Sequence, residues 1–192
     1  MAACGMKKER TWRVLWLAAD VLWIAFIIGH SLRTADESTK ESDYFLQLLR
    51  QIFPWLTSFI IRKMGHFTEF FILGALLFGT WRRWKKVLPT KKNAAIQAPV
   101  DPEGMHDVSR SQSRNQTRAE GMHDTLLTSR KLLDVMIPAA AGLLVAICDE
   151  CVQLGVEGRS GEVRDVLIDF SGVLLAVLVC RILTWLRGRK KE

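Results

Sequence analysis

The sequence predicts an all-α membrane protein with four transmembrane helices, cytoplasmic N and C termini, and an outer interfacial helix between spans 1 and 2. Two observations predict this class. First, 49% of the 192 residues are hydrophobic, and they form long blocks instead of the one-sided stripes of soluble helices. Second, Lys and Arg flank these blocks on alternate sides and leave a net charge of +7. We therefore expect a multi-pass protein of the cell membrane.

Each apolar block is long enough to be considered as a membrane span. A bilayer is crossed by roughly 20 mostly apolar residues, and stretches such as AAAGLLVAI and GVLLAVLVC are apolar on every side. The second block reaches the required length only when its polar start at 63–69 is included. The four blocks cover residues 12–30, 67–81, 132–148 and 166–186.

The basic residues predict the orientation, because short loops rich in Lys and Arg stay in the cytoplasm. The loops at 31–63 and 154–165 are mixed or acidic, so we expect them outside. We assign the basic charge to topology and lipid contact, and expect no nucleic-acid partner. The basic residues are Lys7, Lys8, Arg10 and Arg13 before the first block, Arg82, Arg83, Lys85, Lys86, Lys91 and Lys92 after the second, Arg130 and Lys131 before the third, and Arg187, Arg189, Lys190 and Lys191 after the fourth.

The segments between the blocks differ in character. After a polar outer loop, the stretch FLQLLRQIFPWLTSFIIR has helical apolar spacing and predicts a helix on the outer membrane surface. Residues 82–131 are polar and aperiodic, and predict a disordered cytoplasmic linker. The repeated EGMHD at Glu103–Asp107 and Glu120–Asp124 is interpreted as a duplication within it. The domains are then 12–81, a first transmembrane pair with its outer loop, the linker at 82–131, and 132–186, a second pair.

The cysteines predict neither a disulfide framework nor a metal site. Cys148 and Cys151 form a C-x-x-C pair, but a structural zinc ion needs four ligands and no second pair follows. Two small thiols that pack at the end of a span explain the pair better than redox chemistry. We expect no metal and no cofactor.

Polar residues concentrate at the predicted outer ends of three spans. On a helix, residues three or four apart share a face, and small residues continue the same strips of the third and fourth spans, which favours close helix contact. The loop GVEGRSGEVRD between those spans adds two arginines. The candidate site residues are Lys63, His66, Glu69, Asp149, Glu150, Gln153, Arg159, Arg164, Asp165 and Asp169.

Two interpretations of these groups stay open. A charge at the bilayer centre costs roughly 3 kcal/mol on insertion scales, so groups on separate helices must meet one another or water. They form either a buried ion network that fixes helix register, or an outward polar pocket that binds the head group of a lipid-linked or amphipathic molecule. The two are compatible.

Several of these motifs together resemble the VanZ-like family of bacterial membrane proteins. The motifs are KMGHFTEF at 63–70, DECVQ at 149–153, Arg159 in GRSGEVRD, and DVLIDFSG at 165–172. The resemblance covers about residues 12–81 and 132–186. In two features the chain departs from the family pattern: it has Asp169 where members often carry Asn, and its 82–131 insert is longer.

This resemblance implies a function at the cell envelope. The family's founding member is associated with low-level teicoplanin resistance in Gram-positive bacteria, and teicoplanin carries a lipid tail. We therefore expect a pocket for an amphipathic or lipid-linked ligand that lowers sensitivity to lipoglycopeptides. The alternative is a membrane-embedded enzyme on a lipid-linked envelope precursor, with His66, Glu150 and Asp165 as catalytic candidates. A transporter is a third hypothesis, and a homo-oligomer stays open.

Overall fold

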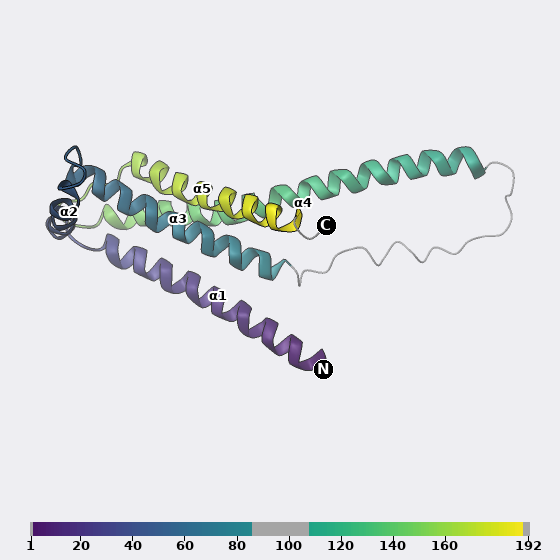
Figure 1. Ribbon diagram of the computed structural model, residues 1–192, viewed down its shortest axis with the longest axis horizontal. Coiled ribbons are helices and arrows are strands. Elements are labelled where there is room, and N and C mark those ends of the chain that lie inside the picture. The colour runs from purple at the N-terminus through teal and green to yellow at the C-terminus, as the bar shows by residue number, and fades with distance from the viewer. Residues whose placement is uncertain (1, 86–107, 190–192) are drawn as a thin grey trace.

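A computed structural model describes residues 2–85 and 108–189, and in this part of the chain all regular structure is helical (Figure 1). The prediction of an all-α protein is confirmed. The five helices are α1 (Ala2–Ser31), α2 (Ala35–Arg50), α3 (Ser58–Trp84), α4 (Val108–Gln153) and α5 (Val163–Arg189).

Three of the five helices are long and apolar enough to cross a membrane, by length and composition, where four spans were predicted. They are the segments Glu9–Ser31, Lys131–Gln153 and Val163–Arg189, within α1, α4 and α5. The second predicted span lies in α3, which is not among them. Its first half carries Arg62, Lys63, His66 and Glu69, and these polar groups interrupt the apolar run that a lipid-facing span requires.

Helix α3 occupies the centre of the bundle and contacts each of the other four helices. In Figure 1, α1, α3 and α5 run alongside one another, and α2 lies at one end of the bundle. The fully buried core includes Ile27, Phe70, Leu73, Val173 and Val177. Because α3 packs on its neighbours, its polar side chains Lys63, His66 and Glu69 meet protein groups.

Glycines bring α3 and α5 into close contact. A Cβ atom on Gly172 would lie 2.5 Å from the backbone oxygen of Phe67, and one on Gly74 would lie 2.7 Å from that of Val173. Real Cβ atoms do not approach backbone so closely, so both positions require glycine. The sequence strip of Asp165, Asp169, Gly172 and Ala176 is thus the face of α5 that packs on its neighbours, and all four residues are buried.

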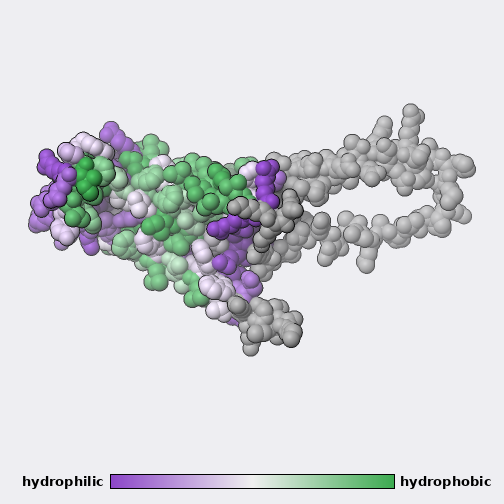
Figure 2. Space-filling model, viewed as in Figure 1, coloured by the Kyte–Doolittle hydropathy of each residue, from purple (hydrophilic) through white to green (hydrophobic). Residues whose placement is uncertain are grey.

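The outside of the bundle is apolar along its length. Figure 2 shows a hydrophobic middle with hydrophilic residues at the α2 end and again toward the opposite end. Large apolar side chains that point outward include Leu22, Leu144 and Leu167, which are 71%, 63% and 62% exposed. An exposed apolar band of this kind on a soluble protein would drive aggregation, whereas lipid covers it at no such cost.

The segment between α1 and α3 differs from its prediction. Residues that were expected to form a polar loop are the helix α2, which begins at Ala35. Thr34 and Glu37 form a capping box: Thr34 Oγ1 accepts from the N–H of Glu37, and Glu37 Oε2 accepts from the N–H of Thr34. This capping box marks the start of the helix at Ala35, ten residues before the apolar stretch that begins at Phe45.

The predicted interfacial helix over 45–62 was therefore misplaced, since the chain leaves helical geometry after Arg50 and re-enters it at Ser58. Pro54 lies in this interval, and it has no N–H to donate to a helix. Whether α2 lies on a membrane surface stays a prediction.

Helices also reach into both ends of the predicted linker at 82–131. Helix α3 continues to Trp84, and α4 begins at Val108. Residues 108–137 contain four arginines and no proline. Because proline is the residue that most strongly disrupts a helix interior, its absence makes a helix compatible with their polarity. Residues 86–107, including the first EGMHD copy, lie outside the described residues.

Candidate functional site

A small polar pocket lies at the α2 end of the bundle, where α3, α4, α5 and the loop between α4 and α5 meet. Its volume is about 150 Å³. Five residues predicted from the sequence line it: Lys63, His66, Gln153, Arg159 and Asp165. The pocket also includes Arg62, Ser160 and Glu162, which sequence reasoning missed.

The α4–α5 loop is held in place by its backbone. Gly158 has a φ of 75°, which non-glycine residues rarely adopt. The N–H of Ala35, the first residue of α2, donates to the carbonyl of Glu157 at 3.4 Å. These two features fix the loop against the start of α2 and place Arg159 in the pocket wall.

Three cationic side chains border the pocket. Lys63 is paired with Asp165, and both side chains are mostly buried, at 16% and 10% exposure. Burial and the neighbouring charge of Arg62 lower the pKa of the Arg159 guanidinium below its usual value. Because only one of the three cations is paired with a lining carboxylate, the wall is suited to an anionic group.

A hydrogen-bonded group from α1 and α4 lies beneath the pocket. Ser31 Oγ donates to Asp149 Oδ1 at 2.5 Å, and the Gln153 amide donates to Asp149 Oδ2 at 2.9 Å. All three residues are buried, and Asp149 is 0% exposed. Ser31 is the first residue of the predicted outer loop at 31–63 and was not among the candidate site residues; the signal that could have found it is a hydroxyl directly after an apolar run.

His66 and Asp169 lie next to this group, deep between α3 and α5. His66 is 8% exposed and Asp169 0%, and the distance from His66 Nδ1 to Asp169 Oδ1 is 3.6 Å. That separation exceeds a hydrogen bond. Accordingly, His66 Nδ1 and both Asp169 oxygens have no hydrogen-bond partner.

The other three predicted residues lie away from the pocket wall. Glu69 pairs with His30, with 2.8 Å between Oε1 and Nδ1. Glu150 is buried, and its Oε2 accepts from the N–H of Glu162 at 2.9 Å, which ties α4 to the loop. Arg164 is exposed and does not line the pocket.

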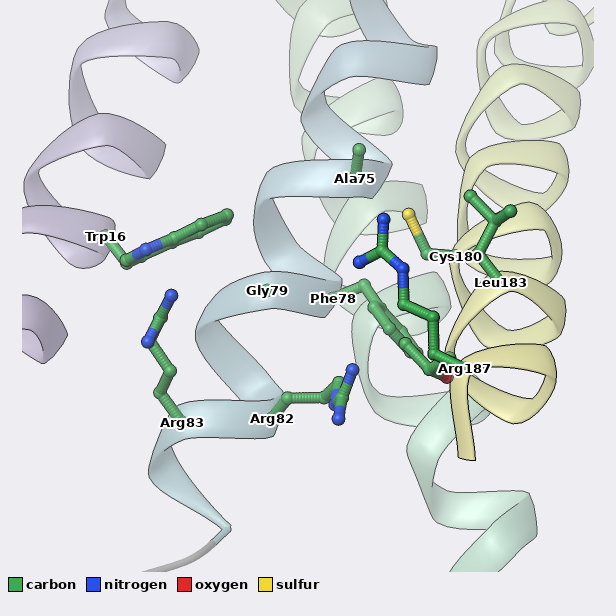
Figure 3. A pocket seen from close by; sticks show the side chains of 10 residues that line it. Trp16, Ala75, Phe78, Gly79, Arg82, Arg83, Cys180, Leu183 and Arg187 are labelled. Carbon is green, nitrogen blue, oxygen red and sulfur yellow. The ribbon is translucent and has the colours of Figure 1, made fainter. Parts of the chain in front are cut away.

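Two further cavities have linings that differ from that of the polar pocket. An apolar groove of about 640 Å³ lies between α1, α2 and α3, with Trp23, Phe45, Leu49 and Met64 in its lining. A cavity of about 390 Å³ lies at the opposite end of the bundle. In Figure 3, Arg83 points toward Trp16 on α1, while Arg187 on α5 extends along Cys180.

Comparison with known proteins gives one match. No curated protein and no solved structure matches the chain. The sequence pattern of one family, described as VanZ/LLP1, matches residues 16–184. The match covers most of the chain and includes every candidate site residue named above. The motifs on α3, α4 and α5, their convergence at one end of the bundle and this match lead to one assignment: the chain belongs to the VanZ/LLP1 family.

Proposed function

We propose that the protein is a cell-envelope membrane protein whose polar pocket faces outward and binds the anionic part of an amphipathic or lipid-linked molecule. In this proposal α1, α3, α4 and α5 all cross the membrane, and both termini are cytoplasmic. Binding lowers sensitivity to teicoplanin-type lipoglycopeptides, a function that rests on the family resemblance.

The observation that carries the proposal is the set of cations in a half-enclosed pocket at one end of an apolar bundle. Arg62, Lys63 and Arg159 all border about 150 Å³. Small-molecule sites usually measure roughly 300–1,000 Å³, so this pocket fits a phosphate or carboxylate group and excludes a whole glycopeptide. Arginine pairs with such groups through two parallel hydrogen bonds.

The apolar groove supports an amphipathic ligand over a fully polar one. It lies on the α2 side of α3 and is lined by aromatic and aliphatic side chains, among them Phe26, Phe53 and Ile72. Helix α3 therefore presents a polar pocket and an apolar groove near the same end of the bundle. A ligand with a charged group and a hydrocarbon part finds matching surfaces for both.

The test replaces Arg159 with Ala in the cellular protein and uses Arg164→Ala as the matched control. Arg159 lines the pocket, whereas Arg164, in the same short segment, is exposed. We expect Arg159→Ala to lower the teicoplanin inhibitory concentration to that of a deletion strain, with vancomycin nearly unchanged. Arg164→Ala should behave as wild type. An equal effect on both drugs, or no effect of Arg159→Ala, contradicts the proposal.

A membrane-embedded enzyme is a second candidate, favoured by one observation. His66 is buried yet lines the pocket, so its imidazole can reach a bound group as a general base while Arg159 stabilises developing negative charge. Lipid and wall-precursor analysis of His66→Ala and Asp165→Asn strains separates the candidates. An accumulated precursor supports the enzyme, and unchanged species with altered teicoplanin sensitivity support binding alone.

A further inference from the structure

We infer that His66, Asp149 and Asp169 bind a divalent transition-metal ion, Zn²⁺ or Mn²⁺, beneath the polar pocket. The sequence predicted no metal because these residues form no recognisable motif: His66 lies on α3, far in sequence from Asp149 on α4 and Asp169 on α5. Folding brings one ligand atom of each to within 4.8 Å of the others. All three residues are buried.

The distance between His66 and Asp169 suits shared coordination of one ion. Zinc lies about 2.0–2.2 Å from imidazole nitrogen and carboxylate oxygen, so two ligands of a tetrahedral ion are separated by roughly 3.4 Å. His66 Nδ1 and Asp169 Oδ1 are 3.6 Å apart. This is too far for a hydrogen bond between them and close to the separation of two ligands on one cation.

The unpartnered atoms point to the same conclusion. Both oxygens of Asp169, at 0% exposure, and Nδ1 of His66 lack hydrogen-bond partners. Buried carboxylates are normally paired or bound to a metal. Lys63 is engaged by Asp165, so it does not neutralise Asp169. A divalent cation balances the charges of Asp149 and Asp169 together.

Asp149 has the surroundings of a metal-binding carboxylate. Ser31 and Gln153 each donate a hydrogen bond to one of its oxygens, and each oxygen keeps a second lone pair for an ion. Carboxylates that bind metals are commonly oriented by such hydrogen bonds. Asp149 is therefore held in position by α1 and by its own helix before any ion arrives.

The donor set selects the class of metal. Imidazole nitrogen suits Zn²⁺ and other transition metals, while carboxylate oxygen also suits Mn²⁺. One histidine is a poor match for Ca²⁺ or Mg²⁺, which prefer oxygen ligands only. Three protein ligands leave a coordination position open, and His66 and Gln153 also line the polar pocket. A group bound in the pocket can therefore reach the ion.

The experiment measures the metal content of the full chain, purified in detergent with a tag that lacks histidine. Cys148 and Cys151 are replaced by Ser in every sample, so that these exposed thiols do not bind metal. After chelator treatment, the protein is dialysed against micromolar Zn²⁺ or Mn²⁺ and analysed by inductively coupled plasma mass spectrometry. We expect near one equivalent per chain, together with a rise in melting temperature.

Variants test which residues hold the ion. Asp169→Asn and His66→Gln should lose nearly all bound metal, and Ser31→Ala should weaken affinity by about 10–100-fold. The control is Asp134→Asn, because Asp134 is also buried but pairs with Lys85 at the opposite end of the bundle; it should retain the metal. If the parent protein, with only Cys148 and Cys151 replaced, holds no metal after dialysis, the inference is overturned whether or not the variants fold; full metal in Asp169→Asn overturns it as well. Since no antibiotic is involved, these outcomes are independent of the proposed resistance function.

Discussion

The Lys63–Asp165 pair is an ion pair across the α3–α5 interface. Both side chains are largely withdrawn from solvent, and Lys63 Nζ also lies 5.2 Å from the ring centroid of Phe59. When one member of a buried ion pair is removed, the other is left as an uncompensated charge. The two residues should therefore be strongly coupled in stability.

We predict that Lys63→Met destabilises the protein by about 3–5 kcal/mol, because it leaves Asp165 buried without a partner. The double variant Lys63→Met, Asp165→Leu should recover most of that loss, since an apolar pair of similar volume needs no counter-charge. Thermal unfolding of the purified protein in detergent measures both. A double variant less stable than Lys63→Met alone would contradict this prediction, because it would show that the unpaired Asp165 is not what destabilises the single variant.

The sequence could identify the polar residues but could not rank them by depth or partner. Helical spacing placed His66 and Glu69 on one face, yet His66 lies under the pocket while Glu69 pairs with His30. Adjacent residues also diverge: Asp149 points to Ser31, whereas Glu150 turns to the loop. Spacing within one helix does not reveal which neighbour each side chain meets, because that depends on the rotation of packed helices.

Among the helices, α2 shows where sequence periodicity was insufficient. Its first half is polar and has no apolar stripe from which a helix could be predicted. The local signal for its start is the capping box at Thr34. Ser38 and Ser42 are nevertheless buried, which shows that this helix packs through small hydroxyl residues. Apolar periodicity detects helices that pack through large side chains and overlooks those that do not.

The α3–α5 contact gives a prediction for the helix pair. Gly172→Ala should destabilise the protein by about 1–3 kcal/mol, because its Cβ would meet the backbone of Phe67 at 2.5 Å and backbone cannot yield as a flexible side chain does. The control is Gly188→Ala on the same helix, where a Cβ would have nothing within 4 Å; it should be neutral or slightly stabilising. The measurement is the melting temperature of each variant. Equal melting temperatures for Gly172→Ala and Gly188→Ala would contradict the close contact between α3 and α5.

For the molecule as a whole, composition predicted an all-α protein, but it did not predict that α3 is missing from the three described helices that are long and apolar enough to cross a membrane. Counting apolar residues treats every span as if lipid surrounded it. Helix α3 instead contacts all four other helices, and Lys63 and His66 lie next to Asp165 and Asp169 of α5. A central helix can be more polar than its neighbours without losing stability, because its polar groups face protein. A criterion based on composition alone then fails to identify it as a membrane span.

Orientation is the remaining prediction for the whole bundle. Arg82, Arg83 and Arg187 line the cavity at one end, and the polar pocket lies at the other. Lys and Arg near span ends are retained in the cytoplasm. The cavity with the three arginines should therefore face the cytoplasm, and the polar pocket should face outward.

We predict that a membrane-impermeant maleimide labels Glu157→Cys in intact cells and labels Gly188→Cys only after the cells are made permeable. Both are built in a chain whose four native cysteines are replaced by Ser. Glu157 is exposed in the α4–α5 loop and Gly188 is exposed near the far end of α5, so the two positions report opposite ends of one helix. The reverse labelling pattern would place the polar pocket in the cytoplasm. A pocket on that side could not meet an extracellular glycopeptide, and the proposed function would fail with the topology.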